Sequence, residues 1–258
     1  MKKDTQNTEA VIAIRNLKKS FGPKEVLKDV TLDLKKQENL VVLGKSGTGK
    51  SVLIKCIVRL LKADAGEIEV FGDEVNTLDK IQLDEVRKKI GFLFQSAALY
   101  DSMTVRENLE FPLRRIKKEL SNEEITKKVE QALENVGLSE AIDKMPSELS
   151  GGMRKRIGLA RTIIVDPEII LYDEPTTGLD PVTSNEISIL INEIQQKYKA
   201  SSIIITHDME CVRTTADRII MLKEGEVYKE GSFKEVEKDN DDYISSFFKP
   251  QNTELNKN

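Results

Sequence analysis

The fold of this chain is decided by an eight-residue stretch in its first quarter, which reads Gly44-Lys45-Ser46-Gly47-Thr48-Gly49-Lys50-Ser51. The octet fits G-x-x-x-x-G-K-[ST], the pattern of a loop that cradles phosphate groups. A short apolar run, Leu40 to Leu43, precedes it, and apolar residues recur at helical spacing from Val52 to Leu61. The pattern is specific in this order of strand, loop and helix, which disfavours a chance glycine-rich turn.

Each part of the octet has a predicted role in holding a nucleoside triphosphate. The glycines let backbone N–H groups converge on the β-phosphate, and the N-terminus of the next helix favours negative charge. Lys50 would reach the β- and γ-phosphates, and the hydroxyl of Ser51 would bind Mg²⁺. The residues expected to contact the nucleotide are Gly44, Lys45, Ser46, Gly47, Thr48, Gly49, Lys50, Ser51 and Val52.

A second stretch, Ile169-Ile170-Leu171-Tyr172-Asp173-Glu174, is an apolar strand that ends in two carboxylates. In open α/β sheets ligands bind at the carboxyl ends of the strands, so Asp173 is placed to complete the Mg²⁺ site. Glu174 would then polarise the attacking water as a general base. A strand that ends in two acidic residues is, alone, often a solvated turn. Because this strand end occurs together with the loop at 44–51, catalysis is the better interpretation of its two carboxylates.

Apolar strands alternate with amphipathic helices along most of the chain. This alternation predicts an α/β fold with a largely parallel sheet that helices cover on both faces. A long helical stretch, at about 96–165, is expected to be inserted in that core. We expect residues 1–249 to form a single domain and residues 250–258 to be a polar C-terminal tail.

The composition limits the class of protein further. The chain has 258 residues, 33% charged and 39% hydrophobic, which is typical of a globular protein with a substantial core. We expect a cytoplasmic protein, because no run approaches the roughly 18 apolar residues of a membrane span and Met1 to Thr8 lacks a secretory signal. A net charge of −4 predicts no nucleic-acid partner. Cys56 and Cys211 lack ligand spacing and are expected to be thiols.

A third stretch, Leu149-Ser150-Gly151-Gly152-Met153, narrows the function. With the first two it makes the chain, from about Val11 to Ser232, resemble the ATP-binding cassette (ABC) ATPases. The resemblance implies a P-loop NTPase core with a mostly parallel sheet, an antiparallel β part at the N-terminus and an inserted α-helical subdomain. It also implies hydrolysis of ATP, with Mg²⁺, by a homodimer. In that dimer Ser150, Gly151 and Gly152 of one copy face the γ-phosphate held by the other.

Four further residues match the family's motifs. Phe21 matches the aromatic that stacks on adenine, and Gln95 matches the glutamine that senses metal and water. Asp180 matches the loop that crosses the dimer interface, and His207 matches the histidine that contacts the γ-phosphate. Each has a simpler alternative. Phe21 could be a core residue, Gln95 a surface glutamine and His207 a structural histidine, while Asp180 is also a fair helix cap before Pro181.

Shorter segments resemble one branch, the ATPases of Mla and Mce-type lipid transporters. They are Phe94 to Tyr100, Phe111 to Arg114, Met145 to Glu148 and Gly151 to Arg156, with Met153 where most importers carry Gln. This branch implies two ATPase copies under an integral membrane permease, an MCE-type lipid-binding protein and, in some systems, a STAS-domain protein. The chain would then lie peripherally on the cytoplasmic face of the inner membrane. Residues 92–113 are predicted to meet the permease, because Ala97 to Tyr100 is apolar for a solvated loop. The alternative is that these residues pack inside the helical insertion.

Other cassette ATPases remain as alternatives. DNA-repair and chromosome-organising ATPases interrupt the cassette with coiled coils or zinc modules, and this chain has neither heptads nor a Cys-x-x-Cys pair. Translation factors of this type place two cassettes in one chain. Single cassettes of cell division, of iron–sulfur assembly or of transporters for another substrate share the layout, and only the branch-level residues disfavour them.

Overall fold

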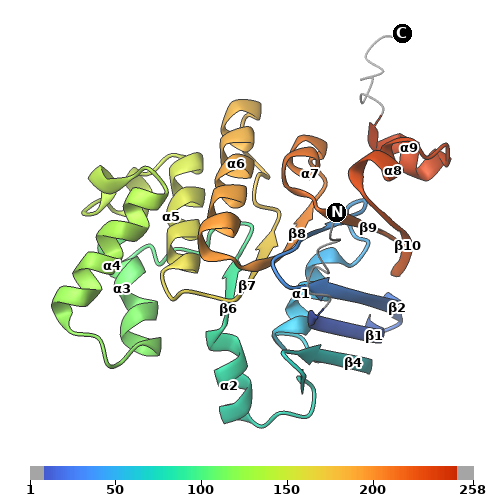
Figure 1. Ribbon diagram of the computed structural model, residues 1–258, viewed down its shortest axis with the longest axis horizontal. Helices are drawn as coiled ribbons and strands as arrows, with labels where there is room; N and C mark the ends of the chain where they lie inside the picture. Colours follow the sequence, from blue (N-terminus) through green and yellow to red (C-terminus); the bar gives the residue numbers. More distant parts are fainter. Residues whose placement is uncertain (1–8, 249–258) are drawn as a thin grey trace, which may run out of the picture.

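The computed structural model describes residues 9–248, which are built around one ten-stranded sheet (Figure 1). The strand order is β5-β4-β1-β2-β10-β9-β3-β8-β7-β6. The strands are β1 (Ala10–Phe21), β2 (Lys24–Lys35), β3 (Asn39–Leu43), β4 (Ala65–Val70), β5 (Asp73–Glu74), β6 (Ile90–Leu93), β7 (Ile169–Asp173), β8 (Ser201–Thr206), β9 (Arg218–Lys223) and β10 (Glu226–Gly231).

The sheet has an antiparallel part and a parallel part. Strands β1, β2, β4 and β5 pair antiparallel, whereas β9, β3, β8, β7 and β6 run parallel. All five residues of β3 are buried, as expected for a parallel strand covered on both faces. The predicted fold class is confirmed: a mixed sheet with a parallel core, an antiparallel N-terminal part and a helical subdomain.

Helices surround this sheet, and three of them lie together at one end of it. They are α1 (Lys50–Ile57), α2 (Lys80–Lys88), α3 (Val105–Ile116), α4 (Asn122–Asn135), α5 (Gly151–Ile163), α6 (Pro181–Tyr198), α7 (Met209–Thr215), α8 (Phe233–Glu237) and α9 (Asp242–Phe248), with short 3₁₀ turns η1 (Ser139–Ala141) and η2 (Pro146–Glu148). Figure 1 shows α3, α4 and α5 at the end opposite to β1, β2 and β4. Among residues 9–248, no helix is both long and apolar enough to cross a membrane.

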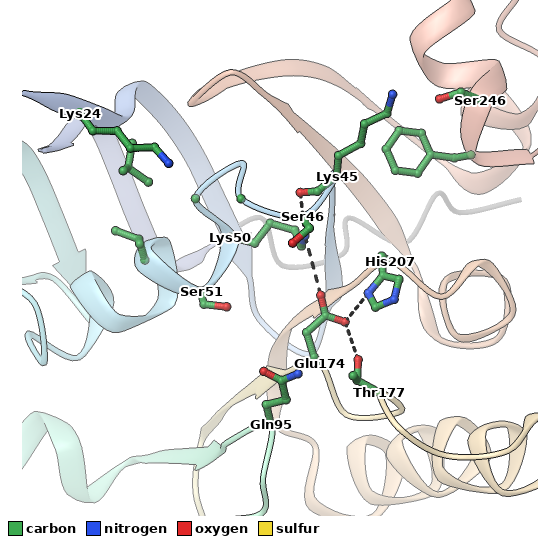
Figure 2. A pocket seen from close by; sticks show the side chains of 15 residues that line it. Lys24, Lys45, Ser46, Lys50, Ser51, Gln95, Glu174, Thr177, His207 and Ser246 are labelled. Atoms are coloured by element: carbon green, nitrogen blue, oxygen red, sulfur yellow. Dashed lines mark hydrogen bonds and ion pairs between the residues drawn. The ribbon is translucent and has the colours of Figure 1, made fainter. Parts of the chain in front are cut away.

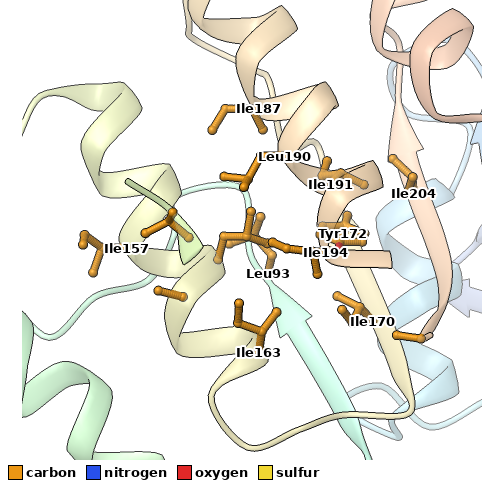
Figure 3. Packing of buried hydrophobic residues seen from close by; sticks show 14 of the residues in the cluster. Leu93, Ile157, Ile163, Ile170, Tyr172, Ile187, Leu190, Ile191, Ile194 and Ile204 are labelled. Atoms are coloured by element: carbon orange, nitrogen blue, oxygen red, sulfur yellow. The ribbon is translucent and has the colours of Figure 1, made fainter. Parts of the chain in front are cut away.

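The core lies on both faces of the parallel strands. Alternate residues of β3 divide between two clusters, Val41 and Leu43 in one and Leu40 and Val42 in the other. Helix α1 packs in the second cluster, and α5 and α6 pack in the first, where their side chains meet those of β6, β7 and β8 (Figure 3). The phosphate-loop helix and the helix that begins after Ser150 therefore lie against opposite faces of the sheet.

The structure departs from the sequence expectations in the less apolar segments. The first helix ends at Ile57, before the apolar residues up to Leu61. Arg59, two residues after the helix end, adopts a positive φ of 49°. No element was predicted between 62 and 89, where β4, β5 and α2 lie. Only Leu83 and Val86 of α2 are buried, so its apolar periodicity is weak. The helices α3 to α5 lie between β6 and β7, and the tail expected at 250–258 lies outside the described residues.

Candidate nucleotide site

The carboxyl ends of the parallel strands open onto a cavity of about 800 Å³ (Figure 2). The loop after β3 supplies Lys45, Ser46, Gly47 and Gly49, and the segment after β6 supplies Gln95. The ends of β7 and β8 are followed by Glu174 and His207. The lining residues are Lys24, Val26, Lys45, Ser46, Gly47, Gly49, Lys50, Ser51, Val52, Gln95, Glu174, Thr177, His207, Ser246 and Phe247. The structure thus brings most of the predicted site residues together, with Gly44 and Thr48 in the same loop.

The turn from the glycine-rich loop into α1 depends on Gly49. This residue precedes the helix with φ 98° and ψ 3°, a left-handed conformation that side chains rarely adopt. A Cβ here would lie 2.6 Å from Cδ2 of Leu27 and 3.0 Å from the carbonyl oxygen of Val26. Only glycine fits, and the free N–H groups of the first turn of α1 are left facing the cavity as an anion cradle.

The ammonium of Lys50 is buried and held mainly by neutral oxygens. It donates to the carbonyl oxygens of Gly44 at 2.7 Å and Lys45 at 3.2 Å, and lies 3.7 Å from Oε1 of Glu174. Burial lowers the pKa of Lys50, and the negative charges of Glu174 and Asp173 oppose that effect. Because carbonyls only partly compensate a desolvated cation, a phosphate oxygen is a better partner that can replace them.

Two oxygen ligands for a hard cation lie side by side next to this lysine. The Ser51 hydroxyl, in the first turn of α1, donates to Oδ1 of Asp173 at 2.7 Å. Mg²⁺ takes few oxygen ligands from a protein and completes its shell with water and phosphate, so this pair fits it. Within residues 9–248 no group of three or more His, Cys, Asp or Glu side chains could hold a metal. The donor set therefore suits Mg²⁺ that arrives with a nucleotide.

The carboxylate of Glu174 is fixed at the edge of the cavity. It lies 2.8 Å from Nδ1 of His207, accepts a hydrogen bond from the Thr177 hydroxyl at 3.0 Å, and is 12% exposed (Figure 2). Its backbone has a φ of 50° and its N–H donates to the carbonyl oxygen of Ile205. A non-glycine residue with positive φ is strained, and such strain gathers at functional sites. Chemically, the group can accept a proton from a water held in the cavity.

A second hollow, of about 490 Å³, contains four more of the predicted residues. Ser150, Gly151, Gly152 and Asp180 line it, and none of these four lines the first cavity. Ser150 also has a role in its own chain: its hydroxyl accepts from the N–H of Met153 at 3.2 Å and caps α5.

Asp180 caps α6 in the same way. It accepts from the N–H groups of Val182 and Thr183 at 3.0 and 3.1 Å, so the expectation of a helix cap is confirmed. The Thr183 hydroxyl also donates to Asp180 and is the largest cause of the lowered pKa of this carboxylate. The two N–H donors lower the pKa further.

Phe21 lines neither of the two hollows. It ends β1, is 47% exposed, and has the ammonium of Lys19 5.5 Å from its ring centre. The alternative of a core phenylalanine is therefore wrong, and Phe21 does not line the cavity. Lys24 and Val26, just after it in the same hairpin, do.

Several residues that line the cavity or contact its lining residues were not predicted as site residues. Ser246 and Phe247 come from α9, which the chain brings to the phosphate loop more than 190 positions away. There the ring of Tyr243 lies 5.2 Å from the ammonium of Lys45. Lys155, in α5, donates to the backbone of both Gln95 and Glu174 and is 5% exposed. Burial lowers the pKa of Lys155 to about 8, against the pull of Glu174 and Asp173.

Comparison with known proteins gives consistent relatives. The chain is 44% identical over 211 residues to the probable ribonucleotide transport ATP-binding protein mkl of Mycobacterium leprae, covering 82% of this chain and 60% of that protein. It is 37% identical to protein TRIGALACTOSYLDIACYLGLYCEROL 3, chloroplastic, of Arabidopsis thaliana, covering 93% of this chain and 74% of that protein. The chain therefore spans less than two thirds of the mkl protein.

A solved structure agrees with these sequences. It is a dimer of the ATP-binding cassette MJ0796 in a post-hydrolysis state with ADP and Pi, and it is 34% identical with a TM-score of 0.79. The match covers 86% of this chain and 98% of that one. The ABC transporter family matches residues 27–177, which hold the glycine-rich loop, Ser150 to Gly152 and Glu174. This chain belongs to the ABC transporter family and carries its ATP-binding domain.

Proposed function

We propose that the protein binds and hydrolyses ATP as a subunit of an ABC transporter, and that two copies close on two nucleotides. The observation that carries this proposal is the division of the predicted site between two hollows of one chain. The phosphate loop lies in one and Ser150 in the other, so a second copy placed head to tail can complete both sites. The MJ0796 structure, a dimer with ADP and Pi, supports this arrangement.

In the proposed reaction Glu174 is the general base. Its carboxylate is held by His207, so it can orient a water and accept its proton without reorganising. Lys50 and the N–H groups at the start of α1 stabilise negative charge on the transferred phosphate. When bound at Ser51 and Asp173, Mg²⁺ supplies further positive charge there.

The remaining site residues keep the proposed roles that the family resemblance implies. Gln95 and His207 act as sensors of metal, water and γ-phosphate, and Phe21 stacks on adenine. Residues 44–52 hold the nucleotide, while Ser150, Gly151, Gly152 and Asp180 serve the nucleotide of the other copy. We propose that all of them belong to one domain, 1–249, with the helical part at about 96–165 inserted.

Steady-state assays of the purified chain test the enzymatic part of this proposal. We expect phosphate release from ATP that requires Mg²⁺ and stops on chelation. Lys50→Ala should lose both binding and turnover. A parent chain without Mg²⁺-dependent ATPase activity, alone and with its membrane partner, would contradict the proposal.

We propose a separate surface for the membrane permease, next to the loop after β6. A hollow of about 480 Å³ there is lined by aromatic side chains. Phe92 and Phe94 stack with ring centres 4.2 Å apart, and Tyr100 and Phe111 lie 5.1 Å apart. Tyr100 is 45% exposed and Phe111 38% exposed. Ala97 is buried, so the apolar run at 97–100 belongs partly to the core and partly to this surface.

A double substitution tests this surface. Tyr100→Ser with Phe111→Ser should weaken co-purification of the permease, while nucleotide binding by the isolated chain is unchanged. Ile189→Ser is the matched control, because Ile189 is a 44% exposed apolar residue of α6 that lies in neither hollow. Equal recovery of the permease with all three chains would contradict the assignment.

The transported substrate is proposed to be a lipid, as in the Mla and Mce-type branch. The supports are the branch-like residues Gly151 to Arg156 and a relative whose name is that of a glycolipid. The mkl relative is named for ribonucleotides, which keeps a different substrate as the second candidate. The lipid proposal adds an MCE-type lipid-binding protein and, as in some systems of this branch, a STAS-domain protein. It also adds a peripheral position on the cytoplasmic face of the inner membrane.

A pull-down from detergent-solubilised membranes separates these functions. A polytopic permease together with an MCE-domain protein and bound phospholipid is the expected result. A permease without an MCE protein would favour a different substrate. A soluble scaffold or a division protein instead of a permease would contradict transport.

A further inference from the structure

Helix α5 holds the loop after β6 through two cations, of which Lys155 is buried and Arg161 is half-buried. Lys155 donates through Nζ to the carbonyl oxygen of Gln95 at 2.5 Å and to that of Glu174 at 3.0 Å. Six residues later Arg161 donates to the carbonyl oxygens of Ala97 and Ala98 at 2.8 and 2.7 Å. Each contact is charge-assisted and therefore stronger than a hydrogen bond between neutral groups.

The helix also packs against this loop without room to slide. Gly158 lies between the two cations on the same face of α5, where a Cβ would be 2.8 Å from Cβ of Ala97 and 3.0 Å from Cδ1 of Leu93. Packed contacts of this kind transmit displacement because interiors are close-packed. A shift of the segment 93–98 therefore has to move α5.

Burial of the Lys155 cation carries a desolvation cost to the stability of the fold. Its side chain is 5% exposed, and among the described residues it takes part in no ion pair within 4.0 Å. A buried cation whose direct partners are only carbonyls is costly, even with the more distant charges of Glu174 and Asp173, and an apolar residue of similar length would be cheaper to bury. Its effect falls instead on the position of two carbonyls, one of which belongs to the strained residue Glu174.

The first turn of α5 is the other end of this connection. Ser150 caps the helix, and Lys155 lies five positions after it, about 7.5 Å along the helix. One side chain thus joins the backbone of Gln95 and Glu174, at the chain's own cavity, to the segment that lines the second hollow.

We propose that Lys155 is a positioning residue that couples the two half-sites of one chain. It keeps Glu174 and Gln95 in place at the chain's own nucleotide and keeps Ser150 in place at the nucleotide of the second copy. This inference rests on the proposed two-copy ATPase. Loss of the Lys155 contacts should impair hydrolysis at both nucleotides that the chain touches.

Steady-state kinetics give the first readout. Lys155→Met should lower kcat by about ten- to a hundred-fold, because small misplacements of catalytic groups cost that much, with KM for ATP changed less than about twofold. Lys155→Gln restores an N–H donor and should recover part of the loss. Lys128→Met is the matched control, because Lys128 pairs with Asp166 on the surface of α4 and should leave kcat unchanged. Thermal unfolding and ATP binding identify a variant that fails to fold.

A mixed dimer then separates coupling from a local effect. One chain carries Lys50→Ala and provides only its Ser150, and the other carries Ser150→Arg and provides the phosphate loop and Glu174. We add Lys155→Gln or Lys155→Met to either chain in turn. The proposal expects the single intact site to lose activity in both cases.

Loss only when the change is on the chain that provides Glu174 would overturn the coupling. An unchanged site in both mixtures, or a loss that matches the fraction of unfolded protein, would overturn it too. A parent mixture that forms no active dimer would overturn the proposed two-copy function, and this inference with it. Failure of the coupling and failure of the two-copy function are distinguishable, because the latter appears in the parent mixture, without any change at Lys155.

Discussion

Replacement of the proposed base by its amide isolates the chemical step. Glu174→Gln keeps the shape of the side chain and removes the charge that accepts the proton. Removal of a general base typically costs about 10²- to 10⁴-fold in rate. That range equals about 3–5 kcal/mol of activation free energy at 1.36 kcal/mol per tenfold change.

Nucleotide binding and folding should survive this change. Lys50 lies 3.7 Å from Glu174 but only 2.7 Å from the carbonyl oxygen of Gly44, so its main partner is retained. The amide oxygen of the new side chain can still accept from the Thr177 hydroxyl. We expect a loss of about 1 kcal/mol or less in the free energy of unfolding, which is a decrease of about 2–4 °C in Tm for a chain of this size.

Single-turnover hydrolysis and filter binding of labelled ATP measure the two effects separately. The variant should bind ATP with the affinity of the parent and retain it unhydrolysed. Turnover within a few-fold of the parent rate, about 1 kcal/mol or less in barrier, would refute the role of Glu174 as base. Loss of ATP binding would instead refute the argument that Lys50 is held mainly by the carbonyls.

Other positions give independent expectations. Asp173→Asn should raise the Mg²⁺ concentration needed for half-maximal turnover, and high Mg²⁺ should restore part of the turnover. An unchanged Mg²⁺ dependence would exclude Asp173 from the metal site. Gly49→Ala should abolish ATP binding, because the new Cβ would lie 2.6 Å from Cδ2 of Leu27 and clash with it. An alanine variant that binds ATP normally would show that the loop can relax. His207 is the only histidine of the chain, so its imidazole NMR signal can be followed in Glu174→Gln without further labelling. Mg·ATP should shift that signal more than Mg·ADP, and equal spectra would remove His207 from contact with the γ-phosphate.

The elements predicted best from the sequence are those whose burial is nearly complete. Strands β3, β7 and β8 are buried at every position, so their composition alone distinguishes them from the surrounding segments. Strand β4 is different, because its first three residues and Glu69 are exposed and leave only two buried positions. Its pairing with β1 depends on the sheet, and no local pattern predicts it.

The candidate site divides in the same way. The phosphate loop is one contiguous stretch of sequence, with Lys50 and Ser51 directly after the glycines. Its phosphate-binding chemistry can therefore be predicted from a local pattern. Lys155 and Phe247 reach the site only through tertiary packing of α5 and α9. Ser150 marks a further limit. Its hydroxyl caps α5 within its own chain, and this local contact does not test the role predicted for Ser150 toward a second copy.

The two-copy site is the central claim, and sedimentation of the Glu174→Gln chain tests it most directly. Without nucleotide the chain should sediment as a monomer, and Mg·ATP should convert it to a dimer because hydrolysis cannot reopen it. Addition of Ser150→Arg to the same chain should abolish the dimer while ATP binding remains. A Glu174→Gln chain that binds Mg·ATP and stays monomeric, alone and bound to its permease, would contradict the account.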